Sequence, residues 1–153
     1  MTREPFDKPI AEVVHSLRRA NERYVDALRK DDIPTANRCF LSMTHDSDCL
    51  AATEEGRLAL EDLTKDPSPH LRLRAAYRCL TWSPRLAVPV IGNLIADDLV
   101  DACAPMERIN IHTSAVDTLL LFFGIESWRQ NDLIEPLRAY GIELPYEEEE
   151  IWT

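Results

Sequence analysis

The apolar positions of this chain recur three and four residues apart, which is the spacing of a helix face rather than of a strand. A first stripe runs from Ile10 to Leu28, and a second follows an Asp-Asp-Ile-Pro turn at 31–34. The buried side predicted for this second helix comprises Ala36, Cys39, Phe40, Met43 and Leu50. Only four glycines are present, and no apolar stretch alternates strictly. The pattern therefore predicts an all-α fold.

The most regular stretch, residues 63–96, is predicted to hold two short helices joined by a tight turn. Asp66-Pro67-Ser68-Pro69 is excluded from a helix interior because proline lacks an amide donor, and Ser68 is expected to cap the helix that follows. The face predicted to be buried holds Leu73, Ala76, Tyr77 and Leu80. Ser83-Pro84 repeats the start signal, and a start near Arg85 would keep Pro89 within the first turn. The second buried face then holds Ala87, Val90, Ile91, Leu94 and Ile95.

This helix pair resembles a HEAT-type repeat, in its 66–69 turn, its Leu-Arg-Leu-Arg-Ala-Ala run at 71–76 and its Ala-Val-Pro-Val-Ile run at 87–91. With Ala-Asn-Arg at 36–38 and a break at Glu-Gly-Arg 55–57, the chain is similar to small bacterial HEAT-like proteins of unknown biochemical function. The resemblance implies a short right-handed array of about six to seven helices, because one repeat cannot bury its own apolar face. Related small helical-repeat proteins often accompany secreted toxins as immunity proteins.

The remaining helices follow from the same spacing. Residues 106–123 are predicted to form the most buried helix, ended by Gly124, with Ile109, His112, Val116, Leu119, Leu120 and Phe123 on its inner face. Because Pro136 lies in the body of the last predicted helix, this helix either starts late, near Asp132, or is kinked, and it ends at Gly141. We expect a single domain over 1–141 and an acidic tail over 142–153.

Charge is unevenly placed along the chain, whose formal net charge is −10. Residues 1–96 carry 14 basic and 14 acidic side chains, whereas residues 97–153 carry 3 basic and 13 acidic ones. An acidic field repels nucleic acid and anionic membranes and attracts a basic partner. The alternative, that this acidity only maintains solubility, remains open.

Two acidic stretches are the candidate partner-binding residues, one in a turn after residue 96 and one in the tail. The tail combines four consecutive glutamates with two aromatic side chains, which are enriched at interaction hot spots. The predicted set is Asp97, Asp98, Asp101, Tyr146, Glu147, Glu148, Glu149, Glu150 and Trp152. Alternatively, the aromatic residues pin the chain end to the last helix and the glutamates stay solvated.

Catalytic and metal-binding patterns are weak. His45 and Cys49 share a helix face, but zinc needs two further ligands and no second pair has ligand spacing. Asp46 and Asp48 should point in different directions on a helix, which makes a poor catalytic pair. His112 is expected to be a satisfied or rim histidine, and the turn carboxylates lack a neighbouring nucleophile or base. We therefore predict no enzyme activity, no metal and no cofactor.

Together these features favour a cytoplasmic protein-binding module. Residues 1–7 lack the apolar core of an export signal, and no apolar run approaches the length of a membrane span. The sequence predicts a basic protein partner, most concretely a toxin domain neutralised by occlusion, and no nucleic acid or membrane. A scaffold or adaptor for another cytoplasmic protein is the alternative.

Overall fold

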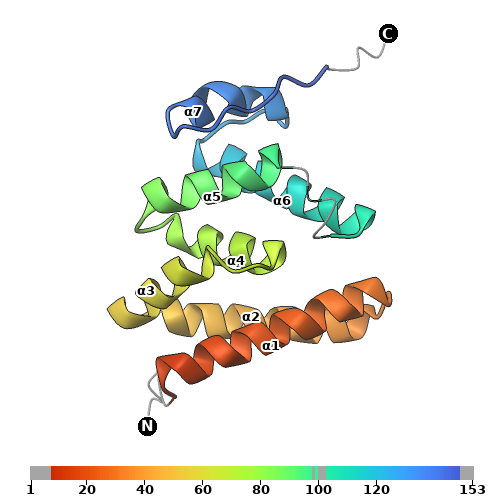
Figure 1. Cartoon of the computed structure of the whole chain (residues 1–153), viewed down its shortest axis with the longest axis vertical. Helices are drawn as coiled ribbons and strands as arrows, with labels where there is room; N and C mark the ends of the chain where they lie inside the picture. The colour runs from red at the N-terminus through yellow and green to blue at the C-terminus, as the bar shows by residue number, and fades with distance from the viewer. Residues whose placement is uncertain (1–7, 98, 100–102, 149–153) are drawn as a thin grey trace. The chain divides into compact units, whose positions relative to one another are not determined.

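The computed structural model describes residues 8–97, 99 and 103–148. Within these residues the chain forms seven α-helices and no strand, which confirms the predicted all-α fold of six to seven helices (Figure 1). The helices are α1 (Ile10–Arg29), α2 (Ile33–Ala51), α3 (Glu54–Leu63), α4 (Pro69–Cys79), α5 (Pro84–Ala96), α6 (Pro105–Phe122), the 3-10 helix η2 (Gln130–Leu133) and α7 (Ile134–Arg138).

The chain divides into two compact units, Met1–Cys79 and Leu80–Thr153. The boundary falls between α4 and α5, inside the stretch predicted to form the central helix pair. Within the first unit α4 packs against α3, and within the second α5 packs against α6. The single domain over 1–141, the tail over 142–153 and the HEAT-like array stay predictions.

The first unit is built on the pairing of α1 with α2. Leu17 of α1 and Leu50 of α2 are both fully buried. Asp31, with φ of 56°, makes the reversal between the helices, a backbone conformation that aspartate tolerates better than most residues. Asp32 then caps α2 by accepting a hydrogen bond from the Thr35 amide at 3.3 Å. Hydrogen bonds from the side chain and the backbone of Thr35 lower the pKa of the Asp32 carboxyl.

The break predicted at 55–57 is misplaced, because α3 already begins at Glu54. Thr53 caps the helix by accepting from the Gly56 amide at 3.0 Å, so Gly56 lies in the first turn. A Cβ at Gly56 would lie 2.0 Å from the carbonyl oxygen of Leu50. The glycine therefore serves the close approach of α2 to α3 rather than a chain break.

The capping prediction for α4 is confirmed, whereas its predicted buried face is right for Ala76 and wrong for Tyr77. Ser68 Oγ accepts from the Leu71 amide at 3.5 Å and Pro69 is the first helical residue. The buried residues of α4 are Pro69, Leu71, Ala75, Ala76 and Cys79. Tyr77, predicted to be inside, is 54% exposed. Small residues dominate the true inner face, and spacing arguments based on large apolar side chains overlook them.

Phe40, also predicted to be buried, is 46% exposed. The Arg74 side chain lies over this ring, with its guanidinium carbon 4.7 Å from the ring centre. The Tyr24 ring lies 6.3 Å from it, centre to centre. An aromatic ring at this position is thus held by a cation–π contact and an aromatic neighbour at the surface of the first unit.

In the second unit, α5 begins at Pro84, as the Ser-Pro signal indicates. Pro89 nevertheless lies beyond its first turn, so the prediction that it must fall within that turn is wrong. The absent side chain of Gly92 lets α7 approach, since a Cβ there would lie 3.1 Å from Leu137 Cδ2. Leu133 and Leu137, both fully buried, anchor η2 and α7 in the core of this unit.

Helix α6 was predicted to be the most buried, but one of its faces is exposed and carries large apolar side chains. Its buried residues are Glu107, Ile111, Ala115, Val116, Leu119 and Leu120. Ile109, predicted to be inside, is 57% exposed, and Leu121 is 80% exposed. The predicted stops are confirmed, because Gly124 and Gly141 adopt φ of 68° and 80°. Its exposed face is the one that borders the hollows described next.

Candidate functional site

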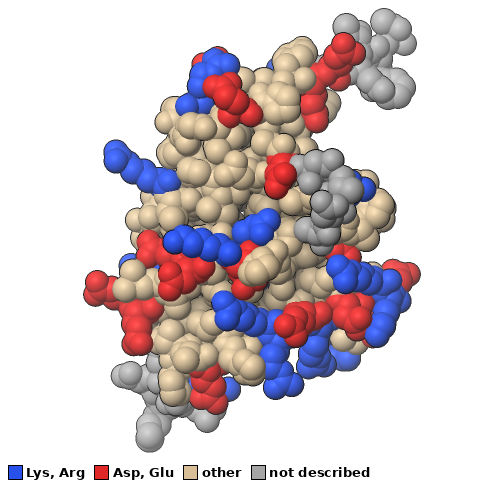
Figure 2. All heavy atoms as spheres, viewed as in Figure 1, with Lys and Arg blue, Asp and Glu red and all other residues tan. Residues whose placement is uncertain are grey.

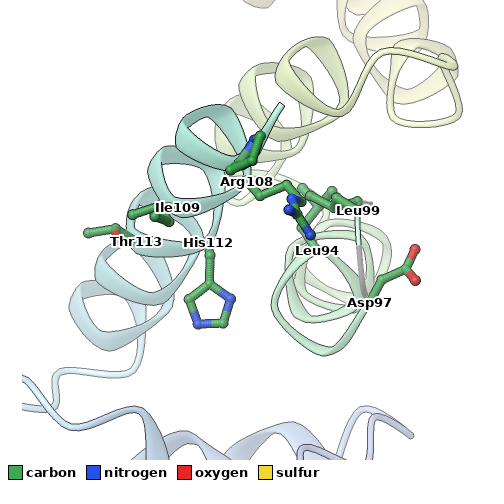
Figure 3. A pocket seen from close by; sticks show the side chains of 8 residues that line it. Leu94, Asp97, Leu99, Arg108, Ile109, His112 and Thr113 are labelled. Atoms are coloured by element: carbon green, nitrogen blue, oxygen red, sulfur yellow. The ribbon is translucent and has the colours of Figure 1, made fainter. Parts of the chain in front are cut away.

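Two hollows lie within the second unit and share part of one wall. The larger has a volume of about 770 Å³ and is lined by His112, Thr113, Val116, Asp117, Trp128, Arg129, Gln130, Asn131, Glu147 and Glu148. The smaller has a volume of about 350 Å³ and is lined by Leu94, Asp97, Leu99, Pro105, Arg108, Ile109, His112 and Thr113 (Figure 3). His112 and Thr113 of α6 belong to both, so the hollows adjoin along that helix.

Among the described residues that line the smaller hollow, the charged side chains form no catalytic pair. In Figure 3 the Asp97 carboxylate points away from Arg108 and His112, which project from α6. The Nε2 atom of His112 lies 2.5 Å from Oε1 of Gln130, so its partner is an amide rather than a carboxylate. The prediction that His112 is a satisfied rim histidine is confirmed, since its side chain is partly buried and hydrogen-bonded.

The larger hollow combines an exposed indole with acidic side chains. Trp128 is 86% exposed. Asp117, Glu147 and Glu148 are exposed carboxylates on the same lining. The lining also holds one guanidinium, Arg129, whose Nε lies 3.6 Å from the Asp132 carboxylate. The hollow therefore presents a net negative surface beside an aromatic ring.

Hydrogen bonds fix the wall of the larger hollow that comes from the end of the chain. The Asn131 side chain donates from Nδ2 to the Glu147 carbonyl at 2.7 Å. The Glu147 amide donates back to Asn131 Oδ1 at 2.8 Å. Leu144, three residues earlier, is buried. A paired amide and a buried leucine thus hold the described part of the predicted tail, whereas Tyr146 is 70% exposed and does not pin it.

The predicted site residues are only partly described. Asp97 is exposed at the smaller hollow, and Glu147 and Glu148 line the larger one. Tyr146 precedes them and is exposed. Asp98, Asp101, Glu149, Glu150 and Trp152 lie outside the described residues. The structure brings the two predicted acidic stretches to adjoining hollows of one unit, through Asp97 on one side and Glu147 and Glu148 on the other.

Sequence reasoning missed the segment between α6 and α7 that forms the other wall, residues 128–131. A signal was available, because Trp128 stands in a polar loop after the Gly124 stop and exposed loop aromatics are a mark of binding sites. The role of Asn131 carries no local signal, because its partner Glu147 is 16 residues away.

The His45–Cys49 pair does share a face, with Cys49 Sγ 3.7 Å from His45 Nε2. Over the residues that the structure describes, no group of three histidine, cysteine or acidic side chains is placed to hold a metal ion. Burial, followed by the charges of Asp46 and Asp48, raises the pKa of the Cys49 thiol and so disfavours the thiolate that a metal prefers.

The two carboxylates beside this pair diverge, as predicted. Asp46 accepts from Ser16 Oγ at 2.8 Å, whereas Asp48 forms an ion pair with Arg78. Each therefore has a separate structural partner within the first unit, and they form no shared acid–base site.

Comparison with family models, with curated proteins and with solved structures finds no match to this chain. Among the helices of the described residues, none is both long and apolar enough to cross a membrane.

Proposed function

We propose that this chain is a non-catalytic protein-binding module whose second unit binds a basic partner through the two adjoining hollows. The observation that carries the proposal is the larger hollow, which is lined by Asp117, Glu147 and Glu148 together with the exposed Trp128. Aromatic anchors with charged rims are typical of protein interfaces. The volume of about 770 Å³ is that of a ligand site rather than of a packing defect.

The charge of the second unit supports a basic partner. Residues 80–153 hold 13 acidic and 4 basic side chains, against 14 and 13 in residues 1–79. An uncompensated charge of one sign accelerates encounter with a partner of opposite charge, and this effect weakens as salt screens it. Binding to this unit should therefore fall as ionic strength rises.

A toxin domain is the partner class that the HEAT-like resemblance favours. Neutralisation would work by occlusion, with the acidic rim covering a cationic cleft that an anionic substrate would otherwise enter. The alternative is a scaffold or adaptor role in the cytoplasm, which needs the same surface but a harmless partner. A neighbouring gene whose product kills when expressed alone would separate the two.

The test is capture of partners from the source cell with the tagged full-length protein, washed at low and high salt and identified by mass spectrometry. We expect a basic protein that is retained at low salt and released at high salt. The variant Glu147→Gln/Glu148→Gln should retain it at least fivefold less, because two rim charges are lost.

The matched control is Glu54→Gln/Glu55→Gln, which removes two exposed charges from the first turn of α3 in the first unit. It should leave capture unchanged. Equal losses in both variants would reduce the effect to net charge and contradict a site in the second unit. A captured protein that is toxic alone and harmless with this chain would establish neutralisation.

A further inference from the structure

Trp128 is the most exposed large apolar side chain in the part of the chain that the structure describes, at 86%. It lies in the loop between α6 and η2, at the wall of the larger hollow. An indole is costly to leave in water and gains most when an occupant covers its face. The structure therefore points to a ligand group that stacks on this ring.

The neighbouring charges indicate that the ligand group stacked on Trp128 is a cation. Asp117, Glu147 and Glu148 line the same hollow and are exposed. The lining cation Arg129 faces the Asp132 carboxylate at 3.6 Å. The three acidic groups therefore make the net charge of the lining negative. A planar guanidinium satisfies both features, because it stacks on tryptophan and bonds carboxylates in a bidentate manner.

The first unit contains an internal example of the same chemistry. The Arg74 guanidinium carbon lies 4.7 Å from the centre of the Phe40 ring, at a partly exposed position. There a guanidinium from α4 lies over an aromatic ring of α2. Trp128 offers a larger ring, and the three carboxylates of its hollow add to the attraction for an arriving cation.

We propose that the larger hollow binds an arginine side chain presented by an extended segment of the partner, with the guanidinium stacked on Trp128 and paired with Glu147 or Glu148. The inference rests on the proposed function and names the anchor of its partner. The volume of about 770 Å³ exceeds one side chain and leaves room for the flanking residues of the segment.

Asn131 acts as a positioning residue in this arrangement. Its side-chain amide makes both hydrogen bonds to the Glu147 backbone, at 2.7 and 2.8 Å. These bonds hold the carboxylate wall opposite α6 and spare the cost of ordering that wall on binding. Asn131→Ala should weaken binding while leaving the Trp128 ring available for stacking.

The experiment uses the full chain and three blocked peptides, tetra-arginine, tetra-citrulline and tetra-lysine, each acetylated and amidated. Calorimetry gives the affinity, and the indole N–H resonance of Trp128, assigned with Trp128→Phe, reports the site. We expect tetra-arginine to bind and shift this resonance, tetra-lysine to bind more weakly, and the neutral isostere tetra-citrulline not to bind.

Variants separate stacking from charge. Trp128→Ala should weaken tetra-arginine about tenfold, and Trp128→Phe much less. Glu147→Gln/Glu148→Gln should weaken it several-fold, and Tyr77→Ala, which alters an exposed aromatic residue of α4 in the first unit, should not. No shift at Trp128, or equal affinity for tetra-arginine and tetra-lysine, would overturn the arginine site. Such a result would leave the proposed function standing if the whole partner is still captured with salt dependence.

Discussion

The two units of this chain differ in where their acidic side chains lie. In the first unit polar groups pair across helices: Ser16 with Asp46 at 2.8 Å, and Asn21 with Ser68 at 3.0 Å. In the face seen in Figure 2, basic and acidic side chains alternate over α1. The second unit has such pairs too, including Asn131 with the Glu147 backbone. It also exposes carboxylates at its hollows, with Asp97 at the smaller one and three more at the larger one.

The difference assigns separate tasks to the two units. Buried polar groups must be paired inside the fold, so those of the first unit contribute to a unique packing and offer nothing to a partner. The carboxylates at the hollows keep their hydration until a partner replaces it. We infer that stability is tested best in the first unit and binding best in the second.

The largest effects should come from truncating one buried leucine in the core of each unit. Leu17→Ala and Leu137→Ala each remove a fully buried side chain and should cost about 2–5 kcal/mol of unfolding free energy. Hydrogen exchange should accelerate mainly in the unit that carries the change, and only Leu137→Ala should impair partner capture. If either variant accelerated exchange equally in both units, the chain would unfold as one body and the comparison would fail.

A smaller effect should follow from breaking one polar pair of the first unit. Ser16→Ala leaves the largely buried Asp46 carboxylate without its hydroxyl donor, at a cost of about 2 kcal/mol. Urea unfolding at neutral pH measures it. The control, Thr118→Ala, removes an exposed hydroxyl from α6 of the second unit and should change stability by less than about 0.5 kcal/mol. Equal costs would show that the first unit does not depend on its internal pairs.

The smallest expected effect is a loss of stability at alkaline pH, caused by the thiol of Cys79, the last residue of α4. Burial, followed by the charge of Glu61, raises the pKa of this thiol from 9.0 to about 12. The unfolded chain releases this proton first, so the stabilising effect is complete below pH 9 and is lost between pH 9 and about 12. Between pH 8 and pH 10 the loss should be about 1 kcal/mol, allowing for solvent screening.

Cys79→Ala isolates this contribution from the lysines and tyrosines that titrate in the same range. The variant should be less stable than the parent at pH 8 and should lose less stability up to pH 10. Identical slopes for the two proteins would remove Cys79 as the source. In the native state the thiol should also resist labelling, because the reactive thiolate is disfavoured.

Local chemistry explains which parts of the fold the sequence could predict. Helix starts at Asp32 and Ser68 and stops at Gly124 and Gly141 depend on hydrogen bonds and φ values within a few residues, and all four are confirmed. The buried faces of α4 and α6 depend on which distant helix packs there. Tyr77 was therefore assigned to the core although it is exposed.

The sequence likewise predicted only part of the candidate site. Charge density alone indicated Glu147 and Glu148, and these residues do line a hollow. The hollow itself needs α6, the loop at 128–131 and residue 147 to meet, which is a property of the folded unit. Asn131 joins the last two through paired hydrogen bonds to Glu147, which is 16 residues away. Local sequence patterns do not predict contacts between residues that far apart.

The close approach at Gly56 has a consequence for the ancestry of the chain. Since a methyl group there would lie 2.0 Å from the Leu50 carbonyl oxygen, substitution is constrained by backbone rather than by a side chain that can drift in compensation. Distant relatives of this chain should therefore keep a glycine six positions after the leucine that corresponds to Leu50, the last buried residue of α2, even where their surface charges differ. That spacing is a signature by which distant relatives can be found.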